Sequence, residues 1–230
     1  MRLNATRVWL DRELTAFAAS LAQGAIVLDA GAGSQKYKGK FSRQIYESAD
    51  FEQVNKRYAP STYVCDLRSI PVDNDRFDAI IFTQVMEHLP EPEIVLSELK
   101  RILKPGGRIF FIAPLYYEEH EKPYDYYRFT QYALEFMFKR AGFEITELRW
   151  LEGFMATTAH KLRYVAKHAP RTPSGYGGGI CGTILLIFFQ ALGLQLRIAS
   201  GLARLSDIRF RYTRRGMPLN YLAILLKPPI

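Results

Sequence analysis

The sequence predicts an α/β fold in which helices cover both faces of a mainly parallel, doubly wound sheet. Two observations carry this prediction. Short apolar, β-branched runs alternate with amphipathic segments of helical length, and the first apolar run ends at a glycine turn. No internal repeat with the period of a solenoid protein competes with this fold. With 230 residues and 48% apolar content, the chain suffices for one such domain carrying an insertion.

The expected elements follow in order along the chain. Apolar residues recur at helical spacing over residues 5–22 and again after Glu91, where Pro105-Gly106-Gly107 is expected to stop the helix. A third helix is expected after Thr130, whose hydroxyl can cap it, and it closes at Gly142. Strands are expected over residues 25–30, 43–50, 62–67, 77–85, 108–116, 143–151 and 219–227.

Residues 152–216 interrupt this alternation and are expected to form a helical insertion between the last two strands. The insertion contains a hinge rich in proline, glycine and serine, and residues 172–196 carry no charge. Three placements of its apolar helix remain open: in the core, on a membrane surface, or across a membrane. For a membrane surface, residues 172–215 would make the contact, with six nearby arginines touching anionic lipid: Arg197, Arg204, Arg209, Arg211, Arg214 and Arg215.

Composition limits the compartment and the partners. The two cysteines, Cys65 and Cys181, lie far apart and outside any C-x-x-C spacing, so neither a disulfide framework nor a structural metal site is expected. The first residues lack the apolar run of a secretory signal. We therefore expect a cytoplasmic protein, peripheral at the inner face of a membrane if the insertion contacts lipid. The net charge of +8 attracts anions in general.

The stretch "AIVLDAGAG" places an acid, Asp29, directly before a glycine turn. Gly31 and Gly33 allow a sharp turn and a close approach of a ligand to the backbone. A dinucleotide site would need a third glycine at position 36, which is Lys36. A carboxylate before the glycines suits a cationic ligand better than a phosphate, which it would repel.

Two further acids end the next two expected strands. Asp50 lies 17 residues after Gly33, where a carboxylate can accept both hydroxyls of a ribose, and Asp66 can accept a hydrogen bond from an adenine amino group. In a parallel sheet these strand ends meet at one edge, where ligands bind. Each acid alone has a solvated strand end as its ordinary explanation. Three of them beside a glycine turn favour a cationic adenosine ligand.

Three blocks then resemble a known family. "VLDAGAG", "CDLRSIPVDNDRFDAIIFTQVMEHL" and "ILKPGGRIFFIAP" occur in the order found in class I S-adenosylmethionine-dependent methyltransferases of the small type 11 group. The resemblance covers about residues 22–151. It implies a Rossmann-like, seven-stranded sheet of order 3-2-1-4-5-7-6 whose last strand is antiparallel. "HEKPYDYYRFT" (120–130) resembles a subgroup with an H-x-x-P-x-D-Y-Y-R-F-T motif, whose members are often linked with glycan or other secondary biosynthesis.

The resemblance also implies a cofactor, S-adenosyl-L-methionine, and a residue set to hold it. Asp29, Ala30, Gly31 and Gly33 would hold the methionine part, and Asp50 the ribose. Asp66 and Leu67 would hold the adenine, and Thr83 and Gln84 would line the sulfonium region. The block around Asp50, "YESADF", is more polar than the family's usual second strand.

Methyl transfer to a hydroxyl needs alignment and a base. His120 and Asp125 are the candidate catalytic residues, because they follow the fifth expected strand, where an acceptor would enter. His88 either faces the acceptor or pins its own loop. The candidate acceptor-binding residues, which supply rings and a cation, are Tyr124, Tyr126, Tyr127 and Arg128.

The sequence therefore favours methyl transfer to a small molecule or glycan, most of all at oxygen. Two alternatives stay open: a non-catalytic cofactor-binding module at a membrane assembly, and a nucleic-acid methyltransferase. The second is disfavoured because the fourth strand is followed by "TQVM", without the Pro-Pro-aromatic signature of amino-methylating DNA enzymes, and no Pro-Cys nucleophile occurs. A nicotinamide oxidoreductase is disfavoured by Lys36 and Asp66.

Overall fold

The computed structural model describes residues 4–53 and 58–229, and these divide into two compact units. Of the described residues, the larger unit comprises 10–53, 58–151 and 220–229, and the smaller unit comprises 4–9 and 152–219. Each unit is described by itself below.

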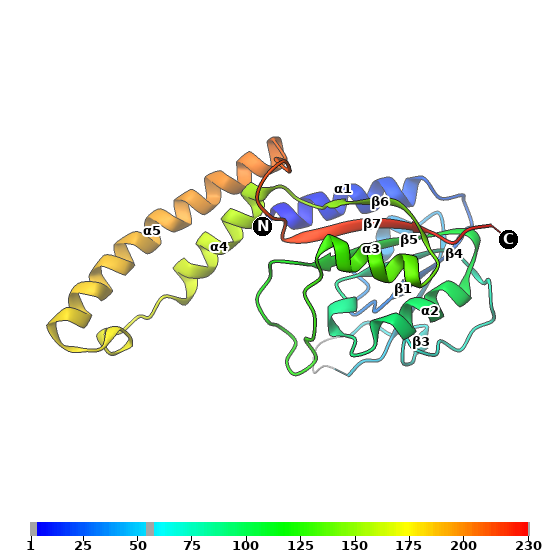
Figure 1. Ribbon diagram of the computed structural model, residues 1–230, viewed down its shortest axis with the longest axis horizontal. Helices are drawn as coiled ribbons and strands as arrows, with labels where there is room; N and C mark the ends of the chain where they lie inside the picture. Colours follow the sequence, from blue (N-terminus) through cyan, green and yellow to red (C-terminus); the bar gives the residue numbers. More distant parts are fainter. Residues whose placement is uncertain (1–3, 54–57, 230) are drawn as a thin grey trace. The chain divides into compact units, whose positions relative to one another are not determined.

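The larger unit contains a seven-stranded sheet of order β3-β2-β1-β4-β5-β7-β6 (Figure 1). Strand β7 runs antiparallel to β5 and β6, and the other neighbouring pairs are parallel. The predicted fold class and strand order are thereby confirmed. The strands are β1 (Ile26–Ala30), β2 (Ile45–Asp50), β3 (Tyr63–Val64), β4 (Phe77–Thr83), β5 (Leu103–Pro114), β6 (Glu144–Trp150) and β7 (Asn220–Leu226).

Helices pack on both faces of the sheet. Phe17 of α1 (Ala5–Ala19) contacts Phe110 of β5 with ring centroids 5.3 Å apart, and Phe138 of α3 (Gln131–Arg140) contacts Phe111 at 5.0 Å. Successive side chains of a strand point to opposite faces, so these two helices cover opposite faces. The expected cap is present, because the Thr130 hydroxyl accepts the backbone N–H of Ala133. Helix α2 (Pro92–Ile102) buries its apolar face in the same core.

Two elements differ from the sequence prediction. Strand β3 has two residues instead of the expected 62–67, because the Asp66 carboxylate accepts the backbone N–H of Arg68 and turns the chain there. Strand β5 begins at Leu103, ahead of Pro105, because Leu103 already pairs with Phe77 of β4. Helix α2 therefore ends before the proline and glycines that were expected to stop it.

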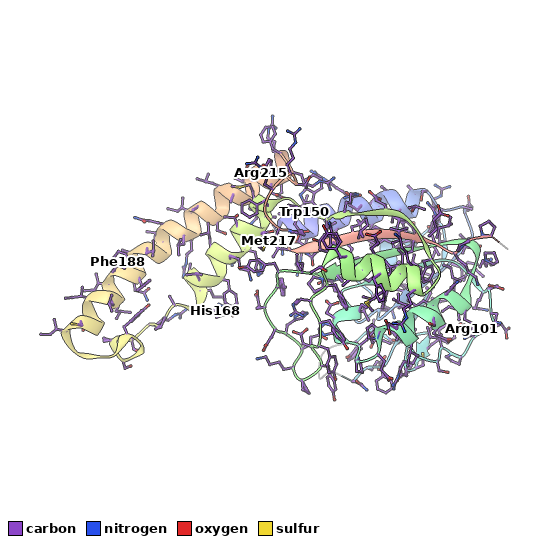
Figure 2. All side chains as sticks on the ribbon, in the orientation of Figure 1. Arg101, Trp150, His168, Phe188, Arg215 and Met217 are labelled. Carbon is purple, nitrogen blue, oxygen red and sulfur yellow. The ribbon has the colours of Figure 1, made fainter. Side chains whose placement is uncertain are left out.

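The smaller unit is a helical hairpin inserted between β6 and β7. Helix α4 (Phe154–His168) leads through a short turn, η3 (Pro173–Tyr176), into α5 (Gly179–Arg209), which packs back along α4 (Figure 1). Two α-helices thus occupy the inserted residues, and of the three placements left open for the apolar helix, burial in the core is disfavoured. Of the most apolar 18-residue window of α5, only 6% is buried. The side chains of α4 and α5 are drawn in Figure 2.

Candidate active site

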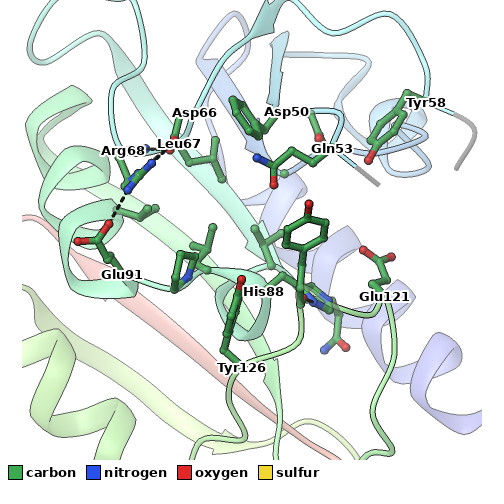
Figure 3. Close-up of a pocket in the computed structure, with 18 residues that line it drawn as sticks. Asp50, Gln53, Tyr58, Asp66, Leu67, Arg68, His88, Glu91, Glu121 and Tyr126 are labelled. Atoms are coloured by element: carbon green, nitrogen blue, oxygen red, sulfur yellow. Dashed lines mark hydrogen bonds and ion pairs between the residues drawn. The ribbon is translucent and has the colours of Figure 1, made fainter. Parts of the chain in front are cut away.

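A cavity of about 260 Å³ lies at the carboxyl ends of β1, β2 and β4 in the larger unit (Figure 3). Such strand ends are where an open α/β sheet binds ligands. Five residues named from the sequence for the cofactor line this cavity: Gly31, Asp50, Asp66, Leu67 and Gln84. His88, Tyr124 and Tyr126, named for the acceptor, line it as well.

The glycine turn after β1 has the geometry that the sequence implied. Gly31 has a φ of +76°, and a Cβ there would come within 2.4 Å of the Val85 side chain, so only glycine fits. Gly33 has a φ of +52°, and a Cβ there would meet open space. The backbone N–H of Gly33 donates to the Asp50 carboxylate at 2.8 Å, which joins the turn to the end of β2.

Asp29 is buried and lies outside the described lining of the cavity, as do its neighbour Ala30 and Gly33. The Tyr46 hydroxyl donates to Asp29 at 2.6 Å. Burial raises the pKa of Asp29 to about 6, against the lowering effect of the Tyr46 hydrogen bond. Asp29 thus anchors β1 to β2 through Tyr46. Any effect of Asp29 on a ligand would be transmitted through the residues that line the cavity.

The two later strand-end acids are held in place by backbone groups. Asp50 accepts the N–H of Gly33 on one oxygen and the N–H of Glu52 on the other. Oδ1 of Asp66 accepts the backbone N–H of Arg68, and Oδ2 accepts both Nε and Nη2 of the same arginine, which also contacts Glu91 (Figure 3). The hydrogen bonds from Arg68 lower the pKa of Asp66. Asp66 is therefore an anion across the neutral range.

The end of β4 forms the floor of the cavity. Thr83 is buried and outside the described lining, whereas Gln84 lines the cavity. Gln84 has a φ of +56°, which a non-glycine residue adopts only when its surroundings hold it there. Its side-chain amide donates to Asn220 at 2.9 Å, and its backbone N–H donates to Ile112. These bonds fix the turn that presents Val85 and His88.

Two imidazoles meet beside the cavity, His88 and His120, hereafter the imidazole pair. Their rings contact edge to face with centroids 4.7 Å apart. Nδ1 of His88 lies 2.5 Å from the carbonyl oxygen of Tyr124. Burial lowers the pKa of His88 below its ordinary 6.5, in spite of that hydrogen bond. His88 is therefore neutral at pH 7.

The carboxyl group of Glu87 is buried next to this pair. Among the described residues neither of its oxygens has a hydrogen-bond partner, and one lies 3.8 Å from Nε2 of His88. Burial raises the pKa of Glu87 to about 8, so it is protonated at neutral pH. Candidate ligand atoms of Glu87, His88 and His120 lie within 4.8 Å of one another, close enough for one cation to bridge them. A cation binding there would have to displace the proton of Glu87, so it would bind more tightly as the pH rises.

Asp125 and Arg128 form an ion pair that braces the loop carrying His120. Arg128 donates to both carboxylate oxygens of Asp125, at 2.7 and 2.8 Å, and the backbone N–H of His120 donates to the same carboxylate. Burial raises the pKa of Asp125, but these bonds outweigh it and bring the pKa to about 2. Within the described structure, His120, Asp125, Tyr127 and Arg128 lie outside the cavity lining.

Several lining residues were not singled out from the sequence. They are Phe51, Gln53, Tyr58, Arg68, Val85, Leu89, Pro90, Glu91, Val95 and Glu121. Most of them lie in loops, where no periodicity marks a residue. Arg68 alone had a signal, because an arginine two residues after a strand-end acid can pair with it.

The wall fits a cation. Of the charged groups that the structure describes there, four are carboxylates, on Asp50, Asp66, Glu91 and Glu121, and one is the guanidinium of Arg68. Apolar side chains such as Leu67 and Leu89 complete the wall beside them. A sulfonium nucleoside combines a positive charge, a ribose diol and an apolar base, so these residues suit S-adenosylmethionine. Fold and site together define an S-adenosylmethionine-dependent methyltransferase of class I.

Comparison with known proteins gives the same class. A family model described as "Methyltransferase domain" matches residues 1–148, and the chain belongs to this family. The expected cofactor and enzyme class are thereby supported. Among similar curated proteins is the tRNA (carboxymethyluridine(34)-5-O)-methyltransferase of Macaca fascicularis, 29% identical over 46% of this chain and 17% of the relative.

A ubiquinone/menaquinone biosynthesis C-methyltransferase of Desulfotalea psychrophila is 36% identical over 30% of this chain and 28% of that protein. The chain thus spans less than a third of the length of either of these relatives. Similar solved structures include an S-adenosylmethionine-dependent methyltransferase of Methanosarcina mazei (TM-score 0.55, 13% identity, 94% of this chain and 98% of that one). Another is the 1,6-didemethyltoxoflavin-N1-methyltransferase of Burkholderia thailandensis (TM-score 0.53, 17% identity, 97% and 81%). At these identities the likeness concerns the fold.

Proposed function

We propose that this chain transfers a methyl group to a hydroxyl oxygen of a small molecule or glycan. The observation that carries the proposal is the placement of His88, a neutral imidazole, on the wall of the cavity that Asp50 and Asp66 also line. The resemblance of residues 120–130 to the glycan-linked subgroup of type 11 methyltransferases supports the acceptor class.

Bound S-adenosylmethionine supplies an already activated methyl group, so the chain has to orient the acceptor and remove its proton. His88 is suited to take that proton. Because Nδ1 of His88 faces the Tyr124 carbonyl at 2.5 Å, Nδ1 carries the hydrogen and Nε2 keeps a lone pair. The lowered pKa keeps this lone pair available at pH 7.

Burial and His120 oppose the imidazolium that proton transfer would create on His88, whereas the carboxylates of Glu121 and Asp125 favour it. A carboxylate oxygen of Asp125 lies 4.0 Å from Nδ1 of His88, and the low pKa of Asp125 keeps it negative. The same low pKa makes Asp125 a poor proton acceptor, so we assign it to positioning. His120 contacts the ring of His88 and is the second candidate base.

The acceptor platform is formed by Tyr124 and Tyr126, which line the cavity. Tyr127 is committed to the fold, because its hydroxyl donates to the Pro90 carbonyl and its ring stacks on Phe129. Arg128 is likewise committed to Asp125. Of the described lining residues only Arg68 is cationic, and it pairs with Asp66 and Glu91, so the two rings suit a neutral sugar or an aromatic alcohol more than an anionic acceptor.

The test is turnover with a panel of sugars and aromatic alcohols, measured as S-adenosylhomocysteine release. His88→Ala is expected to reduce kcat about 100-fold or more and to leave S-adenosylhomocysteine affinity within a few-fold by calorimetry. His120→Ala is compared with it, and His168→Ala, an exposed histidine of the hairpin, is the matched control. Undiminished turnover in His88→Ala, or a product methylated at carbon by mass spectrometry, would contradict the proposal.

A second candidate acceptor is a transfer RNA. It is favoured by the tRNA methyltransferase among the curated relatives and by the net charge of +8. Adding total tRNA to the same assay separates the two candidates. Methylated RNA without methylated sugars or alcohols would replace the first proposal by the second.

A further inference from the structure

The hairpin of α4 and α5 has an unusual distribution of charge. Residues 153–215 contain ten lysines and arginines and one acid, Asp207. Asp207 is fully buried and accepts hydrogen bonds from Trp9 and the backbone of Gly153. The exposed side chains of this hairpin that carry a charge at neutral pH are therefore all lysines and arginines.

The positive residues stop short of the hairpin tip. Ser200 donates to the Ala159 carbonyl at 2.7 Å, and Gln190 donates to the Pro170 carbonyl, which sets the register of the two helices. Arg171 therefore lies near the level of Gln190. Beyond this level lie residues 172–189, hereafter the tip, and the tip carries no charge.

The tip exposes large apolar side chains. The exposed fractions are 81% for Ile180, 66% for Ile187 and 58% for Phe188. Helix α5 is long and apolar enough to cross a membrane, yet unlike the core helix of a globular protein it buries only 6% of its most apolar window. A contiguous apolar surface of this kind marks an interaction site.

The turn at the tip pairs part of its backbone internally, which irregular chain needs in a lipid environment. The N–H groups of Gly175, Gly177 and Gly178 donate to carbonyls of the same turn. The Tyr176 hydroxyl donates to Pro170, and the Tyr176 ring stacks on Phe189 at 5.2 Å. The turn also packs tightly on α5, because a Cβ on Gly182 would come within 2.5 Å of the Pro173 carbonyl.

We propose that this tip inserts into one leaflet of a membrane that contains anionic lipid. From Gly179 to Gln190, α5 rises about 17 Å, close to the roughly 15 Å hydrocarbon depth of one leaflet. Lys167, Arg171 and Arg197 then lie at the headgroups, where cations are attracted to anionic lipid. Deeper insertion would draw Lys161 and Arg163 of the packed helix α4 into hydrocarbon.

A second copy of the chain is a poorer occupant of this surface. The flanks of both hairpins would carry like charges with no exposed acid to pair with them. An anionic lipid surface supplies both the apolar medium and the opposite charge. This inference does not depend on the methyl acceptor.

The test is flotation of the full chain with vesicles of phosphatidylglycerol and phosphatidylcholine in equal parts. Phe188→Glu is expected to weaken binding at least about tenfold. Its matched control is Phe136→Glu on α3, at a phenylalanine with a similar exposed fraction, 61% against 58%. Replacing Arg171 and Arg197 by Gln is expected to weaken vesicle binding about fivefold for each cation removed. The same change at the exposed Lys38 and Arg43 is expected to weaken it little.

The exposed Cys181 reports insertion directly. In a Cys65→Ser background, anionic vesicles are expected to protect Cys181 from a membrane-impermeant maleimide. Equal labelling with and without vesicles, or equal flotation of Phe188→Glu and Phe136→Glu, would overturn the proposal. Labelling of Cys181 by a reagent trapped inside the vesicles would also overturn it, because the helix would then span the membrane. Self-association of the chain without vesicle binding would overturn it as well. Methyl transfer is measured separately, so a failure here leaves the proposed function standing.

Discussion

Replacement of Asp50 should show how much of the cofactor's binding free energy comes from its ribose. Each Asp50 oxygen already accepts one backbone N–H, from Gly33 or Glu52. A carboxylate offers about four lone-pair positions, so two remain for a ribose diol. Hydrogen bonds to a charged group contribute about 1.5–3 kcal/mol each, which makes the two together worth about 3–6 kcal/mol.

We therefore expect Asp50→Ala to weaken S-adenosylhomocysteine binding by at least about 100-fold in calorimetric titration. Asp50→Asn, which keeps one acceptor oxygen, should lie between this variant and the wild type. Glu47→Gln is the matched control, because Glu47 lies on the same strand but contacts Arg76 and Tyr63.

A 2′-deoxy analogue of S-adenosylhomocysteine completes a double-mutant cycle between protein and ligand. If Asp50 holds the ribose, Asp50→Ala should weaken the deoxy analogue less than the parent compound. Equal losses for both ligands would show that Asp50 acts only through the glycine turn. Unchanged affinity in a folded Asp50→Ala protein would refute the ribose assignment itself.

Further predictions concern the rest of the site. Asp66→Ala should weaken S-adenosylhomocysteine about tenfold by calorimetry, since one charge-assisted hydrogen bond from adenine is lost; equal affinity would remove the adenine assignment. Turnover should fall as the pH drops through a value below 6.5, because His88 has a lowered pKa and only its neutral form accepts a proton; a pH profile with its acid limb above 6.5 would assign the base elsewhere. Gly31→Ala should lower the free energy of unfolding by about 2–4 kcal/mol in denaturant titration, because of its left-handed φ and the clash with Val85, whereas Gly39→Ala meets nothing and should change it little. EDTA should leave turnover unchanged, because the proposed step uses the lone pair of His88 and no metal; loss on chelation and recovery with a divalent metal would point to a metal site at Glu87, His88 and His120 instead.

Local chemistry made part of this structure predictable. The apolar run before Asp29 and the glycines after it specify a strand followed by a sharp turn, whatever the rest of the chain does. The Thr130 cap is similarly local, since donor and acceptor lie three residues apart. The strand order came from the family resemblance, because no local pattern in the sequence states which strands are neighbours.

The arrangement around the imidazole pair depends on contacts between distant residues. His88 bonds the carbonyl of a residue 36 positions later, and Gln84 bonds Asn220 across 136 positions. No spacing rule relates such pairs, so the sequence named His120 as a base and left open whether His88 faces the acceptor or pins its own loop. The exposure of α5 was open for another reason. A helix that is apolar on all sides has the same pattern in a protein core and in lipid.

The position of the charge, more than its total, bears on the acceptor. Residues 153–215 carry a net charge of +9 and the whole chain +8, so the remainder has one net negative charge. The excess of positive charge that would attract phosphates therefore lies in the hairpin residues. The described cavity wall has four carboxylates against one guanidinium, and it attracts a cationic donor but repels a phosphodiester. A nucleic acid bound by the hairpin would still have to bring its backbone toward that wall. A neutral hydroxyl compound meets no such barrier, and for this reason we favour it as the acceptor.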